Sequence, residues 1–231
     1  MEFNENDKKQ FNIIAGVFII LASLIVFLSK DEGYKPEKAA IPVLYEPQQM
    51  NLPPEYKLTL TGQRNVKNQD VFIYAQAFYK IHCRVMHIMP YYTGVSGGLA
   101  PVDFAVVWGE LIKKENYEQI EFRQSGRWAY FKPKNKSLYD REFIYKHFSN
   151  MHVIPADSIV LAGLKSVRKY DEIYMEGYLV NIESFKNGQR SMTWNSSLSR
   201  DDTGNGACEV MFVTKIITKD GEFVSAKNQK K

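Results

Sequence analysis

The chain has 231 residues, and its 30 Lys and Arg residues exceed its 26 Asp and Glu residues by 4. A charge excess this small, lying largely in the C-terminal tail, excludes nucleic acid as the expected partner. The two cysteines, Cys83 and Cys208, lie in no spacing typical of a zinc site, so we expect neither a metal nor a cofactor.

The chain opens with a polar tail at residues 1–10, followed by an uncharged apolar run at residues 11–28. As a helix this run would be about 27 Å long, close to the thickness of a bilayer's hydrocarbon core. A cleaved signal peptide is the alternative, but no small-residue cleavage site follows the run. We therefore expect a transmembrane anchor, with the long domain after it on the extracytoplasmic side.

Residues 29–54 contain five prolines, which favour an extended linker. We expect a single globular domain over residues 55–217, because its length suits one hydrophobic core. Residues 218–231 are polar and basic and predict a flexible tail.

Strand patterns dominate the domain. Residues 71–79 fit either a strand or a buried helix, residues 91–101 predict a loop, and Gly177 predicts a bulge or a sharp bend within its strand. Strands are expected at residues 81–89, 104–111, 119–123, 128–131, 172–183, 190–194 and 208–217, and helices near residues 140–149 and 156–166. Their short spacing predicts an α+β fold: an antiparallel, curved sheet or small barrel with two short helices, preceded by one transmembrane helix. The pattern over residues 169–180 is similar to that of small barrels such as OB-folds.

Residues 194–209 carry the densest group of chemically able side chains. Their serines and aspartates suit local backbone hydrogen bonds, so we expect this loop to be ordered. We expect it to pack against residues 149–156, which we interpret as a connection between the two helices. The candidate binding residues are Ser196, Ser197, Arg200, Asp202, Asn150 and Trp108.

Cys208 has three interpretations. It begins an apolar strand and would share a face with Val210, which favours a core cysteine. It could form a disulfide with Cys83. It could also be a nucleophile with His152 as its base and an acidic residue such as Asp202 to orient the imidazole.

Five stretches resemble, in order, an uncharacterised family of bacterial single-pass membrane-anchored proteins with PVDxAxxWG, SNMHxIPA and WxSSLxRDDTGxGACE motifs. The stretches are residues 101–109, 124–128, 149–156, 177–180 and 194–209. The resemblance implies one anchored domain in the bacterial inner (cytoplasmic) membrane, and it implies no activity.

These patterns lead to two expectations about function. The first is an envelope protein whose domain binds a protein partner or ligand next to the membrane. The alternative is a thiol-dependent hydrolase or transpeptidase that uses Cys208 and His152, and the sequence leaves open whether the protein is an enzyme.

Overall fold

The computed structural model describes residues 34–53, 64–134, 138–199 and 208–226. The chain divides into a unit of residues 1–35 and a unit of residues 36–231, and every strand and helix of the described residues belongs to the second unit. No helix among the described residues is long and apolar enough to cross a membrane. The expected anchor at residues 11–28 lies outside the described residues.

Strands form most of the second unit. They are β1 (Gln48–Asn51), β2 (Arg64–Val66), β3 (Gln69–Pro90), β4 (Val102–Val107), β5 (Ile120–Ser125), β6 (Trp128–Pro133), β7 (Phe148–Pro155), β8 (Glu172–Lys186), β9 (Gln189–Asn195), β10 (Glu209–Thr218) and β11 (Gly221–Val224). The helices are α2 (Gly94–Leu99), the 3-10 helix η1 (Gly109–Ile112), α3 (Lys114–Tyr117), α4 (Arg141–Lys146) and α5 (Ser158–Ser166).

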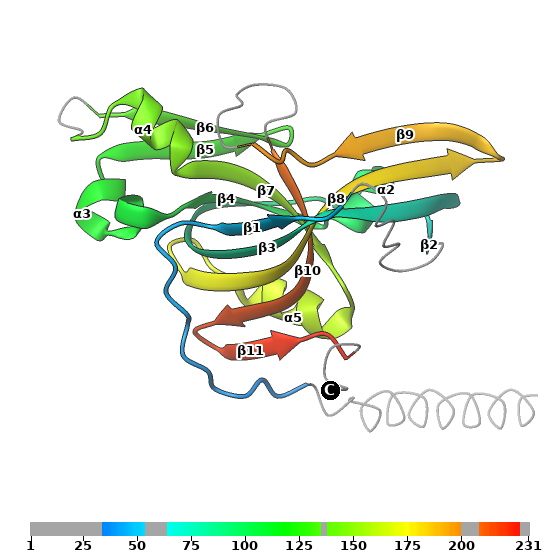
Figure 1. Cartoon of the computed structure of the whole chain (residues 1–231), viewed down its shortest axis with the longest axis horizontal. Coiled ribbons are helices and arrows are strands. Elements are labelled where there is room, and N and C mark those ends of the chain that lie inside the picture. Colours follow the sequence, from blue (N-terminus) through cyan, green and yellow to red (C-terminus); the bar gives the residue numbers. More distant parts are fainter. Residues whose placement is uncertain (1–33, 54–63, 135–137, 200–207, 227–231) are drawn as a thin grey trace, which may run out of the picture. The chain divides into compact units, whose positions relative to one another are not determined.

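Within the described residues, nine strands form one sheet, and β5 pairs with β6 in a second one. The main order is β1-β3-β4-β7-β10-β8-β9, and β8 also pairs with β3 (Figure 1). Five strands, β3, β4, β7, β10 and β8, therefore form a closed ring of hydrogen-bonded neighbours. Only the pair of β7 and β10 is parallel among these ring pairings. The predicted α+β fold with a curved, mostly antiparallel sheet is confirmed.

Residues 71–79, which the sequence left open, belong to the 22-residue strand β3. Alternate side chains from Val71 to Tyr79 are buried, as in a strand that packs one face on a core. Gly177 lies opposite a bulge, but the extra residue is in the partner strand β10, because the register of β10 against β8 shifts between Val213 and Lys215. A Cβ on Gly177 would overlap the carbonyl oxygen of Phe212, so glycine permits this close approach.

The ring strands carry different cores on their two faces. Phe104, Met151 and Met211 pack together with Val160 and Leu164 of α5 in a core that we call the inner core, and we call the opposite face of the ring strands the outer face. The residues next along β7 and β10 point to the opposite face, because side chains alternate along a strand. That face holds a second core of nine buried residues: Val71, Ile73, Leu99, Ala100, Ile154, Val180, Ile182, Val210 and Phe212.

Three sequence expectations need correction. Residues 149–156 are not a connection between helices, because nearly all of them belong to strand β7 between β4 and β10. Strand β11 lies within the range expected to be a flexible tail, and it is held by pairing with β10 and by the buried ring of Phe223. Strand β1 lies within the range expected to be a linker and pairs with β3.

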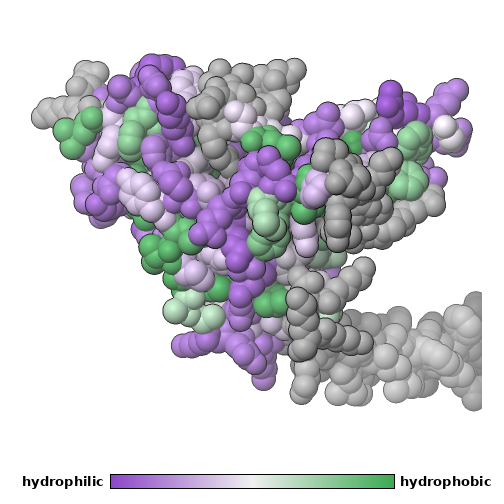
Figure 2. Space-filling view, in the orientation of Figure 1, coloured by the Kyte–Doolittle hydropathy of each residue, from purple (hydrophilic) through white to green (hydrophobic). Residues whose placement is uncertain are grey.

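Several local expectations hold. The hairpin of β5 and β6, the hairpin of β8 and β9, and helices α4 and α5 occur where the sequence predicts them. Helix α2 lies where a loop was expected, and η1 and α3 were not predicted. Figure 2 shows that hydrophilic residues surround separate apolar patches on one face of the molecule.

Candidate functional site

Polar side chains gather on the outer face of three neighbouring ring strands. Asp103 of β4 pairs in register with His152 of β7, and His152 pairs with Val210 of β10. Cys208, two residues before Val210, therefore lies level with Asn150 on the same face. The Asn150 side-chain amide accordingly lies 4.0 Å from the Cys208 sulfur. The sheet thus brings together residues that are up to 105 positions apart in the chain.

Asp103 is the centre of this group and is fully buried. One of its carboxylate oxygens accepts a hydrogen bond from Arg127 Nη1 at 2.7 Å. The other lies 2.8 Å from His152 Nδ1, a close contact that lacks the alignment of a hydrogen bond. A buried carboxylate requires such partners, because moving an ion from water into a protein interior costs roughly several kcal/mol of free energy.

Arg127 reaches Asp103 from the tight turn between β5 and β6. Both turn residues, Gly126 and Arg127, have positive φ angles of 56° and 68°. This is the conformation of the two-residue hairpin turns that match strand twist, although a non-glycine residue adopts it only at some cost. The turn directs the Arg127 side chain back over the sheet.

The guanidinium of Arg127 is held between two aromatic rings. It lies 3.8 Å from the ring centre of Tyr91 and 5.0 Å from that of Trp194. The Tyr91 hydroxyl accepts a hydrogen bond from the Arg127 backbone N–H at 2.8 Å. Burial, and then the negative charge of Asp103, raises the pKa of Tyr91, so this hydroxyl stays protonated at neutral pH. Arg127 is therefore fixed in place before any ligand binds.

A chain of side-chain amides continues the network. Asn150 Nδ2 donates to the carbonyl oxygen of Arg127 at 2.8 Å, and Gln124 Nε2 donates to Asn150 Oδ1 at 2.5 Å. Gln124 Oε1 lies 3.0 Å from His87 Nδ1. Asn150, a predicted binding residue, is buried, so it positions its neighbours instead of facing solvent.

A pocket of about 350 Å³ opens beside this network. The ring centre of Trp194 lies 4.8 Å from that of His152, and so the indole forms one wall beside the imidazole. The lining residues are Arg127, Trp128, His152, Thr193, Trp194, Asn195 and Cys208. His152 and Cys208, which the sequence paired as base and nucleophile, therefore border the same pocket.

The two predicted serines make hydrogen bonds within the protein. Ser196 Oγ accepts a hydrogen bond from Val210 N at 3.0 Å, and Ser197 N donates to the carbonyl oxygen of Cys208 at 3.0 Å. They join the end of β9 to the start of β10. Arg200 and Asp202, at the centre of the same loop, lie outside the described residues.

Trp108, another predicted binding residue, is buried. Its side chain is 1% exposed and belongs to the inner core. Its indole Nε1 donates to Glu46 Oε2 at 2.9 Å, so its polar group is used within the protein. An indole in this position holds the segment around Glu46 against the domain.

The two cysteines differ in environment, and neither forms a disulfide within the described residues. The proposed bond between them is therefore wrong. Cys83 is fully buried in the inner core, where burial raises the pKa of its thiol. Cys208 shares the face of Val210, as expected for a core cysteine, but it is only partly buried and lies at the pocket.

Asp103 and Arg127 were not among the candidate residues from the sequence. A signal for Asp103 was present, because a lone carboxylate in the apolar strand 102–107 needs a buried partner. Nothing local to the sequence indicates that Arg127 is this partner, since it lies 24 residues away on another hairpin.

No group of three or more His, Cys, Asp and Glu side chains in the described ranges is arranged to hold a metal ion. Comparison with known proteins finds no matching family model, no matching curated protein and no matching solved structure. The site must therefore be interpreted from its own residues.

Proposed function

We propose that this chain is a membrane-anchored envelope protein whose domain binds a ligand, or a segment of a partner protein, in the pocket beside His152 and Trp194. The buried group of Arg127, Asp103 and His152 carries this proposal. Buried ion pairs contribute little net stability compared with apolar packing, so a stability role explains them poorly. Fixed charges beside a pocket are, in contrast, what a binding site requires.

The chemistry of the pocket wall limits the ligand. Trp128 and Trp194 offer flat apolar surfaces, while Thr193 and Asn195 offer hydrogen-bonding groups. The charge of Arg127 is balanced by Asp103, which disfavours a strongly anionic ligand. We infer a neutral, partly apolar ligand with hydrogen-bonding groups, such as a sugar ring or an uncharged peptide segment.

The arrangement of the ring supports the same face as a binding surface. Numbered along the chain, the ring strands follow the order 1-2-3-5-4, which is that of small OB-type barrels. OB-type barrels bind ligands on their second and third strands and in adjoining loops. Here these strands are β4 and β7, which carry Asp103 and His152. This is fold-level analogy, and the residues themselves carry the argument.

Photo-crosslinking in the native membrane tests the proposal. A photoreactive phenylalanine analogue replaces Trp128 in the full chain, and a matched control replaces Tyr145, which has similar exposure but does not line the pocket. We expect a crosslinked product from position 128 that is lost when Thr193→Ala and Asn195→Ala are added. Identical products from both positions would contradict the proposal.

A second candidate function is thiol-dependent acyl transfer. The observation that favours it is the placement of Asp103 behind His152, with His152 and Cys208 at one pocket. In this reaction His152 takes the thiol proton, the Cys208 sulfur attacks a carbonyl carbon, and the leaving group departs with that proton. Water or a second amine then cleaves the resulting thioester and releases the thiol.

Alkylation by iodoacetamide tests the second candidate, with Cys83 as an internal control. We expect Cys208 to react in the folded protein and Cys83 to react only after unfolding, a rate difference on the order of a hundredfold or more. If Cys208 is an activated nucleophile, His152→Asn slows its alkylation near neutral pH but not at high pH. An equal rate for the variant and the parent at every pH would exclude His152 as its base.

A further inference from the structure

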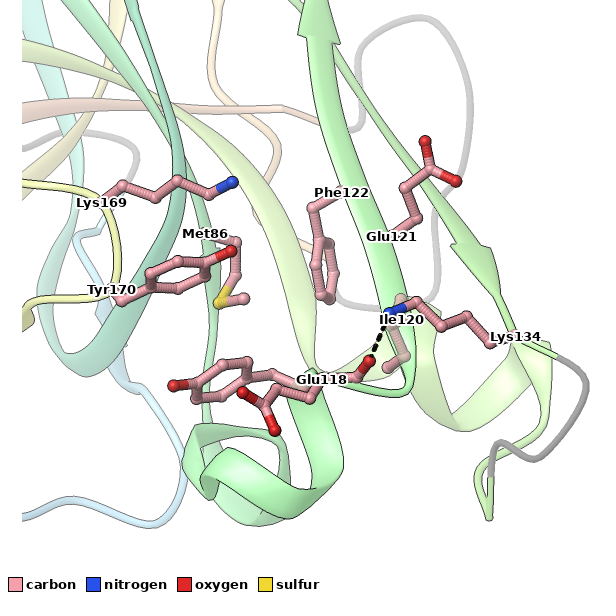
Figure 3. Close-up of a pocket in the computed structure, with 9 residues that line it drawn as sticks. Met86, Glu118, Ile120, Glu121, Phe122, Lys134, Lys169 and Tyr170 are labelled. Atoms are coloured by element: carbon pink, nitrogen blue, oxygen red, sulfur yellow. Dashed lines mark hydrogen bonds between the residues drawn. The ribbon is translucent and has the colours of Figure 1, made fainter.

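A second pocket, of about 510 Å³, lies between α3, β5 and the turn that follows α5 (Figure 3). It shares no lining residue with the pocket at His152. We propose that it binds a phosphate group of a larger molecule. This proposal does not depend on the function proposed for the first pocket.

Two lysines supply the positive charge. Lys169 and Lys134 line the pocket from opposite sides in Figure 3. Lys134 Nζ donates one hydrogen bond to the backbone carbonyl of Glu118 at 2.7 Å, which leaves further N–H groups for a ligand. Among the described residues, no carboxylate lies within ion-pair distance of Lys169 or Lys134. Their charges are therefore available to an anion.

Two carboxylates also border the pocket, and both have other orientations or partners. Glu118 lies 3.8 Å from the ammonium of Lys114. Figure 3 shows the Glu121 carboxylate directed away from Met86 and Tyr170. Glu121 pairs in register with Lys132 across the hairpin. Neither carboxylate therefore neutralises the two lysines directly.

A strained turn holds Lys169 in position. The next residue, Tyr170, has a φ of 72°, which is unfavourable for a bulky side chain. Its backbone is fixed on both sides, because Tyr170 N donates to Val85 O at 2.6 Å and Arg84 Nη1 donates to Tyr170 O at 2.6 Å. Its ring stacks on Tyr117 with 5.4 Å between ring centres. Strain that the surroundings enforce in this way is concentrated at ligand-binding sites.

The surface of this pocket is mainly polar. Met86, Ile120 and Phe122 lie beneath it and are buried in a core cluster of their own. The Lys169 ammonium lies 4.7 Å from the ring centre of Tyr170, which holds it at the pocket. Lysine binds phosphate as a point charge, so the two lysines suit a phosphate group. A lipid headgroup and a soluble phosphorylated molecule both have this chemistry.

Binding of two probes to the detergent-solubilised full chain tests the proposal. One probe is inorganic phosphate, followed by phosphorus NMR, and the other is short-chain phosphatidylglycerol, followed by calorimetry. We expect binding of phosphatidylglycerol in either case. Binding of inorganic phosphate as well indicates a soluble phosphorylated ligand, whereas binding of phosphatidylglycerol alone indicates a lipid.

Lys169→Gln should weaken binding about tenfold, as expected for the loss of one charged contact. The matched control is Lys165→Gln, an exposed lysine at the end of α5 that does not line the pocket, and it should leave binding unchanged. Lys169→Arg should restore most of the affinity, which separates loss of charge from damage to the turn. Absence of binding to both probes, or equal effects of the two Gln variants, would overturn the proposal.

Discussion

Two histidine–carboxylate pairs of this protein have similar distances and opposite environments. His152 lies 2.8 Å from Asp103, with side chains that are 4% and 0% exposed. His147 lies 3.1 Å from Glu46, with side chains that are 13% and 52% exposed. If one partner is lost, water can replace it at Glu46 but not at Asp103. The comparison teaches that burial, more than distance, decides whether such a pair fixes its surroundings.

The pair of His147 and Glu46 holds the segment around residue 46 against the domain. Glu46 accepts hydrogen bonds from Trp108 and contacts His147, so it holds the chain around residue 46 against α4 and the end of β4. His147 in turn stacks on Phe143, with 4.0 Å between ring centres. The site pair organises a pocket, while this pair joins a segment expected to be a linker to the domain.

Removing the buried carboxylate should have the largest effect. Asp103→Ala leaves Arg127 without its buried counter-charge, and we expect the free energy of unfolding to fall by about 3–5 kcal/mol. Denaturant unfolding of the full chain in detergent measures this loss. The control is Glu183→Ala, which breaks the more exposed pair with Arg190 and should cost at most about 1 kcal/mol. Equal losses would break the distinction between the buried and the exposed pairs.

Asp157 provides an intermediate case. Its carboxylate caps α5 by accepting from Ile159 N and Val160 N, and it also accepts from Ala226 N at 2.9 Å. Burial alone would raise the pKa of Asp157, but these hydrogen bonds outweigh burial and hold its pKa below the ordinary value. Asp157→Ala should cost about 1–2 kcal/mol at neutral pH, as for other lost N-caps.

The pH dependence of this cost has a definite sign. Because the pKa of Asp157 is lower in the folded than in the unfolded chain, its stabilisation is complete above the unfolded value and is lost as pH falls through the folded one. The difference between parent and Asp157→Ala should therefore narrow below pH about 4. Unfolding curves at pH 7 and at successively lower pH measure it, and a difference that widens in acid would contradict the assigned ionisation.

Opening the exposed pair should have the smallest effect on stability. Glu46→Ala removes one ion pair and one hydrogen bond near the surface, so we expect a loss of at most about 1 kcal/mol. The effect on local hydrogen exchange should be clearer, because the segment around residue 46 loses the contacts of Glu46 with Trp108 and His147. Hydrogen exchange measured by mass spectrometry should show faster exchange there and no change at β7. A loss as large as that of Asp103→Ala would remove the contrast between the two pairs.

Local sequence signals predicted much of the fold. The alternation before Pro90 indicates β3, and the Asn187 and Gly188 turn indicates the hairpin of β8 and β9. Each of these depends on neighbouring residues only. Closure of the ring depends on pairing of β3 with β8, about 100 residues apart (Arg84 with Glu172, for example), and no local pattern encodes it.

The site was predicted in part for the same reason. His152 and Cys208 were paired as candidates, and the structure brings both to one pocket. Asp202, the candidate to orient the imidazole, lies outside the described residues, and Asp103 is the carboxylate that the described part of the chain places beside His152. Trp108 was interpreted as a binding residue because an isolated tryptophan gives no indication of whether its indole N–H has a partner within the protein.

The position of β10 has a consequence for the order in which the protein can form during synthesis. In the ring, β10 lies between β7 and β8 and pairs with both. Within the described residues, β7 and β8 do not pair directly with each other. Until residues 209–218 emerge, both of these strands present an unpaired edge to their surroundings. A nascent chain is thus most prone to aberrant association after β8 has been made and before β10 arrives. The last ring strand to be synthesised completes the ring, and it follows directly after Cys208, which lines the pocket.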